Sequence, residues 1–242
     1  MLKRILLSLL LLVVLLLGWA QLLGSGVLGG PLNSETVVAG PRPATSTGDN
    51  PQVLFGDLHS HTSLSLDAYV FGTNLVKGGG VVTPADACDF ARYCSALDFW
   101  SINDHAENLT PRMWTDTLAS IRDCNNNAGV SSNPDMVSFV GWEWSNSEKD
   151  DVASHYGHKN VIFRSWEEGQ VPARPIAASA NNVVNRVPSI VVGALNLIED
   201  VSTVADLGYY LDEFQSSSVC PEGVHARELS DDCREVALTP QS

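Results

Sequence analysis

The first 23 residues of the chain are mostly apolar. Two basic residues, Lys3 and Arg4, precede a nearly unbroken apolar run from Ile5 to Leu17 that continues more weakly to Leu23. Polar residues do not alternate with these leucines, which argues against a buried core helix. A basic start followed by an apolar stretch is typical of an export segment, and this run is also about long enough to cross a bilayer. The pattern predicts a cleaved signal peptide or a retained membrane anchor over residues 1–23.

The hydrophobic period is lost over residues 24–51. This stretch is rich in Gly, Pro, Ser and Thr, and it contains Pro-Arg-Pro at 41–43. Such a composition predicts a flexible linker. We therefore expect the folded domain to occupy residues 52–242.

Apolar runs and helix-start patterns alternate after the linker. Thr83-Pro84 and Thr110-Pro111 each place a capping threonine before a proline, which is a preferred way to begin a helix. The apolar runs around them are short enough to be buried strands. The expected elements are a strand from Val53 into His59, a helix over 84–95, a strand over 97–103, a helix from Pro111 to about 125–129, strands over 136–144 and 159–163, a weakly periodic apolar stretch over 181–198 and a short helix over 206–214.

This alternation predicts an α/β fold with a parallel sheet or barrel. In such folds, functional residues gather at the carboxyl ends of the strands. His59 and His61 end the first strand on one face, because side chains along a strand repeat every second residue. His105 follows the second strand and Glu143 lies at the end of the third. Since these residues come from three separate elements, their common position indicates a site.

The composition restricts the partners. The chain is 44% hydrophobic and 17% charged, as expected for a globular protein, and its formal net charge is −14. An acidic surface repels the phosphate backbone of nucleic acids and anionic lipid head groups, so we expect no nucleic-acid partner. The charge does not exclude a small anionic substrate held by a metal.

Five cysteines suit an oxidising compartment. Cys88 and Cys94 lie six positions apart in an expected helix, about 9 Å along its axis, which is too far for a bond between them. Either of them could pair with Cys124, and Cys220 could pair with Cys233; free buried thiols are the alternative. With the N-terminal run, the cysteines indicate an exported protein, either periplasmic or anchored to the inner membrane with its domain outside the cytoplasm.

Histidines and carboxylates between residues 59 and 158 carry the candidate chemistry, and five of the six histidines lie there. Imidazole and carboxylate ligands accept Zn, Mn and Fe alike, and a carboxylate can bridge two metals. The chain has no Gly-x-Ser-x-Gly and no Gly-rich phosphate loop, so a metal-activated water is the expected nucleophile. The candidate residues are Asp57, His59, His61, Asp67, Asp104, His105, Glu143, His155 and His158.

Each candidate also has an ordinary structural interpretation. The histidines of the first pair could simply end a strand, His105 could cap its strand, and Glu143 could face solvent between two tryptophans. Asp57 could fix the backbone near the first histidine pair. His155 fits a loop residue better than a ligand, and His225 fits the surface.

Three motifs contain most of these candidates: Phe-Gly-Asp-Leu-His-Ser-His-Thr at 55–62, Asn-Asp-His at 103–105 and Gly-Trp-Glu at 141–143. They resemble the first motifs of the PHP superfamily, named for polymerase and histidinol phosphatase. The longer pattern, which includes Gly-Trp-Glu-Trp-Ser and Gly-His-Lys-Asn-Val-Ile-Phe at 157–163, resembles a bacterial domain-of-unknown-function family (3604) related to PHP. The resemblance runs from about Val53 to the C-terminus.

The resemblance implies a distorted (β/α)7 barrel that binds up to three divalent metals, Zn, Mn or Fe, and hydrolyses phosphoesters. Within it, Asp67 and His105 would serve a third metal. His105 and Asp104 are the implied catalytic residues, and Asp104 would orient its neighbours without binding metal. The implied metal ligands are His59, His61, Asp67, His105, Glu143 and His158.

The same resemblance divides the other ligands between two metals. His59 and His61 would bind the first metal, and Glu143 would bridge it to the second. His158 would join Glu143 on the second metal.

The chain departs from this family in its second half. PHP-like proteins carry a further histidine after a later strand and an Asp-x-His at the last, whereas after His158 this sequence has only His225 and no Asp-x-His. Four strands are counted where the fold needs about seven. We therefore expect an N-terminal part of a longer protein, or else an open barrel without its closing ligands.

Two functions follow from these patterns. The first is an exported metal-dependent hydrolase, with a small phosphorylated or other ester compound as its substrate. The second is a non-catalytic PHP-like domain that binds metal or a partner at the cell surface. Membrane contact is expected through the N-terminal segment if it is uncut, and the substrate, the metal and the oligomeric state stay open.

Overall fold

The computed structural model describes residues 2–32, 53–130, 133–146, 156–167, 169–177, 187–221 and 223–235. The chain forms two compact units. The helical unit contains Met1–Leu32, Thr73–Gly80 and Asn182–Ser216, and the sheet unit contains Asn33–Gly72, Val81–Asn181 and Ser217–Ser242. Most of the expected linker, His155 and the apolar stretch before residue 187 lie outside the described residues.

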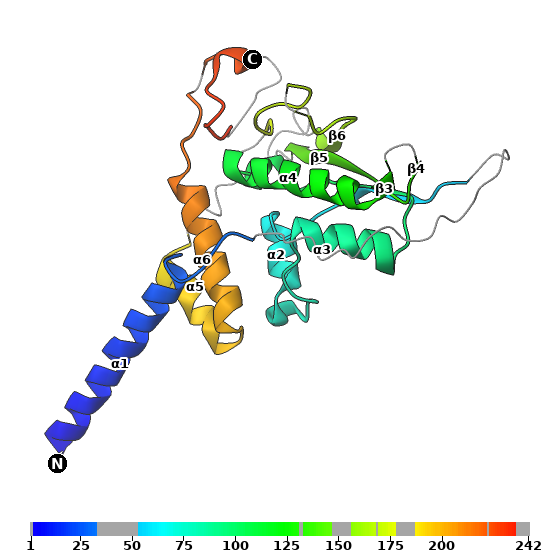
Figure 1. Cartoon of the computed structure of the whole chain (residues 1–242). Coiled ribbons are helices and arrows are strands. Elements are labelled where there is room, and N and C mark those ends of the chain that lie inside the picture. The colour runs from blue at the N-terminus through cyan, green and yellow to red at the C-terminus, as the bar shows by residue number, and fades with distance from the viewer. Residues whose placement is uncertain are drawn as a thin grey trace. The chain divides into compact units, whose positions relative to one another are not determined.

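The helical unit is built on helix α1 (Leu2–Gly24), which the N-terminal apolar run forms. Within the described residues, α1 is the one helix long and apolar enough to cross a membrane. Helices α5 (Ser189–Ala194) and α6 (Val201–Ser216) pack beside the C-terminal end of α1, joined by a 3-10 turn over Leu195–Leu197 (Figure 1). The N-terminal apolar helix is confirmed, and it fits either a signal segment or an anchor.

Helix α6 contains the predicted helix over 206–214 and begins earlier than the sequence indicates. Asp200 sets the start, because its Oδ1 accepts a hydrogen bond from the backbone N–H of Thr203 at 2.8 Å. The neighbouring Glu199 is buried and accepts from the backbone N–H groups of Asn74 and Leu75. Glu199 thereby attaches the 3-10 turn Asn74–Val76 to the rest of the helical unit.

The sheet unit contains a four-stranded sheet. Its strands are β1 (Gly56–Ser60), β2 (Phe99–Ile102), β5 (Val137–Asn146) and β6 (Gly157–Phe163), in the order β1-β2-β5-β6. The first three are parallel, as the strand–helix alternation predicts, whereas β6 runs antiparallel to β5. A parallel return needs a crossover of about a dozen residues or more, and residues 147–156 are too few for it. The prediction of a parallel sheet therefore holds for three strands and is wrong for the fourth.

The two edge strands of this sheet approach each other. Asn160 of β6 donates from Nδ2 to the carbonyl oxygen of Leu58 in β1 at 3.0 Å. The sheet is therefore curled like part of a barrel. Its helices and strands confirm the α/β class, while the seven-unit PHP-like barrel stays a prediction, since the described residues hold four strands of this sheet.

The helices of the sheet unit begin where the threonine–proline pairs predict. Thr83 and Asp86 form a capping box at the start of α3 (Pro84–Asp89), and Thr110 accepts from the Met113 N–H at the start of α4. The remaining bounds are α2 (Leu66–Gly72), α4 (Pro111–Asn127), a π-helical turn that extends α3 over Phe90–Cys94, the short strands β3 (Gly129–Val130) and β4 (Asn133–Pro134), and 3-10 turns over Ala106–Asn108 and Ala226–Glu228.

Tryptophans fill the core between α4 and the sheet. Trp114 of α4 and Trp142 of β5 are buried, with ring centroids 5.2 Å apart in an edge-to-face arrangement. The disulfide between Cys88 and Cys124 joins α3 to α4, and a second disulfide joins Cys220 to Cys233. Both pairings are among those the sequence left open, and both suit an extracytoplasmic location. Cys94 is free and exposed.

Candidate metal centre

The first histidine pair ends β1. His59 lies in β1 and His61 directly follows it, so strand alternation puts both rings on one face, with their Nε2 atoms 2.9 Å apart. Both rings face Glu143, whose Oε2 is 2.9 Å from His59 Nε2 and 2.8 Å from His61 Nε2. The side chain of His59 is 51% exposed and that of His61 is 18% exposed, so His59 lies at the surface and His61 is mostly buried.

Glu143 lies at the centre of the cluster. It belongs to β5, its side chain is only 3% exposed, and a parallel bridge sets it beside His105. Its Oε2 faces the first histidine pair, while its Oε1 contacts the Nδ1 of His158. Burial alone would raise the pKa of Glu143, but the surrounding imidazoles lower it below its ordinary value. Glu143 is therefore an anionic carboxylate with each oxygen turned toward different imidazoles.

His105 and Asp67 form a second group in the cluster. The Nε2 of His105 is 3.3 Å from Oδ2 of Asp67, which lies in the first turn of α2. The hydrogen bond with His105 lowers the pKa of Asp67 to about 2. Burial disfavours the charged form of His105, yet its hydrogen bond to Asp67 and the nearby carboxylates of Glu107 and Glu143 raise its pKa overall. Asp67 thus remains ionised, and His105 readily holds a proton when no metal is bound.

His158 reaches the cluster from the antiparallel strand. It lies opposite Ser145 in the pairing of β5 with β6, because the start of an antiparallel strand meets the carboxyl end of its neighbour. Its Nδ1 contacts Glu143 and lies 3.0 Å from the hydroxyl of Ser145. The side chain is 53% exposed, so this edge of the cluster is open to solvent.

These residues fit a divalent metal by chemistry and by spacing. Three sets each offer ligand atoms that all lie within 4.8 Å of one another: His59, His61 and Glu143; His61, Asp67 and His105; and His105, Glu143 and His158. Ligands about 2.0–2.2 Å from a tetrahedral metal stand roughly 3.3–3.6 Å apart, so modest side-chain adjustments would bring each set onto one ion. The structure brings together all six predicted ligands, and their metal-binding roles stay predictions.

Asp104 belongs to none of the three ligand sets. It is 1% exposed, and its oxygens accept from the backbone N–H of Thr62 at 2.7 Å, the Thr62 hydroxyl at 2.8 Å and the Ser65 hydroxyl at 2.9 Å. Burial raises its pKa although these hydrogen bonds oppose the change. Asp104 fastens the loop that follows His61, which suits the predicted orienting role.

Three polar residues of the cluster have no signature in the sequence. Ser65 contacts the Nδ1 of His61 at 3.1 Å and accepts from the backbone N–H of His105 at 2.9 Å. Ser145 lies 3.0 Å from the Nδ1 of His105, and the carboxylate of Glu107 lies 3.6 Å from the same atom. Spacing could have suggested two of them. Ser145 shares a strand face with Glu143 two residues earlier, and Glu107 lies two residues after His105.

The other predicted candidates have structural roles or lie elsewhere. Asp57 accepts from the backbone N–H of His59 at 2.8 Å, so it fixes the backbone near the histidine pair as expected. His225 is exposed and caps the turn over 226–228 by accepting from the N–H of Arg227.

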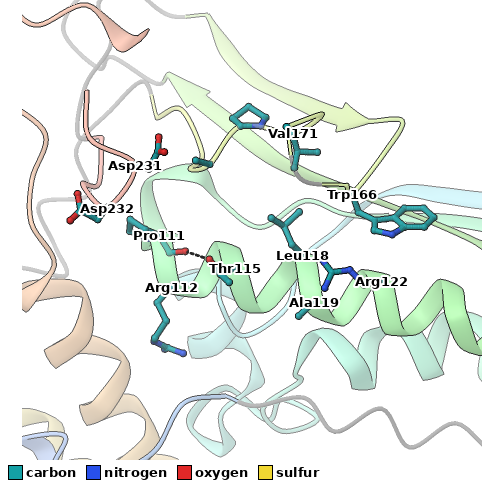
Figure 2. A pocket seen from close by; sticks show the side chains of 13 residues that line it. Pro111, Arg112, Thr115, Leu118, Ala119, Arg122, Trp166, Val171, Asp231 and Asp232 are labelled. Carbon is teal, nitrogen blue, oxygen red and sulfur yellow. Dashed lines mark hydrogen bonds between the residues drawn. The ribbon is translucent and has the colours of Figure 1, made fainter. Parts of the chain in front are cut away.

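A hollow of about 780 Å³ lies on another part of the sheet unit. Figure 2 shows Leu118 and Arg122 of α4 beside the segment that carries Trp166 and Val171. Two acidic residues, Asp231 and Asp232, line its far end. None of its lining residues belongs to the histidine cluster, so this hollow is a separate surface feature.

Comparison with known protein families yields a match to part of the chain. The model of the family described as "Protein of unknown function (DUF3604)" matches residues 48–112, which include His59, His61, Asp67 and His105. Glu143 and His158 lie beyond the match. No curated protein and no solved structure matches the chain. The match supports the predicted likeness to a domain-of-unknown-function family and leaves the link to the PHP superfamily as a proposal.

Proposed function

We propose that this protein is an exported metal-dependent hydrolase that cleaves phosphoesters with a metal-activated water. The observation that carries the proposal is the buried carboxylate of Glu143, which faces imidazoles from β1 on one oxygen and from β6 on the other. Sites of this kind, with histidine and carboxylate ligands and an open side, are typical of hydrolytic metal centres.

The residues divide naturally between two or three metals. His59 and His61 would hold one ion with Oε2 of Glu143, and His158 would hold another with Oε1. Asp67 and His105 would serve a third. Zn, Mn and Fe all suit these ligands. Such ions would make bound water acidic enough to attack at neutral pH and would withdraw charge from the phosphoryl oxygens.

The remaining groups of the chain support this chemistry by position. If the Nε2 of His105, which faces Asp67, binds the third metal, its Nδ1 remains 3.0 Å from the hydroxyl of Ser145. Hydrogen bonds of this kind fix the ring orientation and the tautomer of a metal-binding histidine. The half-exposed rings of His59 and His158 leave the cluster accessible to a small substrate.

The test is hydrolysis of p-nitrophenyl phosphate and bis(p-nitrophenyl) phosphate by the intact purified protein, with Mn, Zn or Fe supplied. We expect turnover that falls by at least about 100-fold in His59→Ala and Glu143→Gln, because loss of even a supporting group costs 10–100-fold at metal sites. His225→Ala, which changes an exposed histidine outside the cluster, is the matched control.

Two results would oppose the proposal. Turnover that survives both cluster variants would place the chemistry elsewhere. Metal binding without hydrolysis of any phosphoester or other ester would instead indicate a non-catalytic metal-binding domain.

A further inference from the structure

The C-terminal end of α1 is packed against α5 backbone to backbone. A Cβ atom added at Gly24 would lie 1.7 Å from the carbonyl oxygen of Ser189, and one added at Gly193 would lie 1.6 Å from that of Ala20. Both glycines are therefore required by the close approach of the two helices. The pairing of Gly24 with Ser189 and of Ala20 with Gly193 also shows that α5 runs antiparallel to α1.

The residues after α1 are held by α6 in the same way. A Cβ at Gly29 would lie 1.9 Å from the carbonyl oxygen of Ala205, and the N–H of Gly30 donates to Oδ1 of Asp206 at 3.1 Å. Leu23 is completely buried. The small residues over 24–30, which could have offered a cleavage site, are thus folded into the helical unit. Cleavage there would remove the surface on which α5 and α6 pack.

The turn between α5 and α6 exposes apolar side chains and ends in two carboxylates, the buried Glu199 and the exposed Asp200. No charged residue occurs from Val187 to Ile198. Large apolar side chains project outward on this stretch and at the start of α6: Val191 is 52% exposed, Leu197 88%, Ile198 52% and Val201 46%. We call residues Leu195–Val201 the hairpin tip. Because α5 runs antiparallel to α1, the hairpin tip extends along α1 toward its N-terminal end (Figure 1).

Trp19 indicates where the membrane–water interface would cross α1, and so how deep the hairpin tip would lie. Its side chain is 44% exposed near the C-terminal end of α1, and tryptophans at such positions favour the membrane–water interface. The next residue, Ala20, faces Gly193 of α5. The hairpin tip follows the end of α5 at Ala194, just past Gly193, so it reaches the interface if α1 spans the membrane.

We propose that α1 is retained as a membrane anchor and that the hairpin tip inserts beside it into the interfacial layer of the same bilayer. The exposed carboxylate of Asp200 sets the depth, since a charge is costly in hydrocarbon and tolerated among head groups. Leu197 and Ile198 enter the acyl boundary while Asp200 stays with the head groups. Insertion is driven by apolar side chains, because the acidic chain gains nothing from anionic lipids.

The test uses the intact protein reconstituted in phosphatidylcholine vesicles. Leu197→Cys is labelled with a fluorophore in a Cys94→Ser background, and Ser216→Cys, at the opposite end of α6, is the matched control. Leu197 is almost wholly exposed, so its replacement leaves the packing intact. We expect strong quenching of the Leu197→Cys label by lipids with a shallow nitroxide and several-fold weaker quenching by iodide than at Ser216→Cys.

Mass spectrometry of the protein from the membrane fraction provides a second readout. We expect peptides from residues 2–23 in the mature protein. A mature N-terminus within 24–30 would overturn the proposal. A Leu197→Cys label as open to iodide as the control would also overturn it, and so would a label shielded from iodide but not quenched by nitroxide lipid, which would indicate a protein contact instead.

Discussion

Ser65 is the residue whose removal tests most sharply how the cluster is supported. Its side chain is fully buried, and its hydroxyl donates to Oδ1 of Asp104 at 2.9 Å while accepting from the N–H of His105 at 2.9 Å. It also lies 3.1 Å from Nδ1 of His61. Replacing Ser65 by alanine deletes one oxygen and leaves these buried groups without that partner.

The cost can be estimated from those contacts. A buried polar group left unsatisfied costs about 1–3 kcal/mol, which applies to the His105 N–H in Ser65→Ala. The Asp104 carboxylate also loses a donor but keeps two hydrogen bonds from Thr62, so its contribution falls at the low end of that range. We therefore expect a loss of about 2–4 kcal/mol in the free energy of unfolding of the sheet unit. For a unit of this size, the melting temperature should fall by roughly 5–15 °C.

A second buried serine provides the control. Ser120 of α4 is 4% exposed, and its hydroxyl has no hydrogen-bond partner among the described residues. Ser120→Ala therefore removes the same atom without removing a contact, and alanine also favours a helix. Thermal unfolding followed by the near-ultraviolet circular dichroism of the buried tryptophans compares the two variants. Equal melting temperatures for Ser65→Ala and Ser120→Ala would refute the reasoning.

Further predictions concern the disulfides and the cluster's response to pH. Opening the Cys88–Cys124 bridge by double serine substitution should lower the free energy of unfolding by about 4 kcal/mol, and opening Cys220–Cys233 by about 3 kcal/mol. The difference arises because the closed loops span 36 and 13 positions. Denaturant unfolding that ranks the two losses in reverse order would contradict this. Because the folded-state pKa of His105 is raised, protonation stabilises the metal-free protein below the unfolded imidazole value of about 6.5, and this contribution is lost as the pH rises through the folded pKa. This contribution raises the melting temperature of the metal-free protein at pH 6 relative to pH 8, whereas His61, whose pKa is lowered by burial, acts in the opposite sense. His105→Gln should therefore lower the melting temperature at pH 6 relative to that at pH 8, and an unchanged pH dependence would contradict this.

Local chemistry made the helix starts and the positions of four strands predictable. The Thr83-Pro84 and Thr110-Pro111 pairs act within one turn, so their outcome does not depend on the rest of the fold. The direction of β6 was not predictable from hydrophobicity, because an apolar run looks the same in both directions. The packing of α5 and α6 on α1 was equally hidden, since it depends on glycines that carry no hydrophobic pattern.

The candidate ligands were predictable because imidazoles and carboxylates at strand ends are uncommon and chemically specific. His158 reaches the others from the beginning of an antiparallel strand, a position that only the sheet topology reveals. Ser65 and Ser145 were missed, since serine is common and its role depends on which buried groups happen to surround the hydroxyl. Spacing excluded a Cys88–Cys94 bond but could not choose the partner of Cys124, which the three-dimensional packing decides.

The central claim is that Glu143 organises a divalent-metal site, and titration of metal into the intact protein tests it most directly. Glu143→Gln keeps the size of the side chain and removes its charge, while His225→Ala serves as the control. We expect the natural protein and His225→Ala to bind Mn, Zn or Fe, and Glu143→Gln to bind at least about 100-fold more weakly. Equal affinity and stoichiometry in all three proteins, or no binding by the natural protein, would contradict the account.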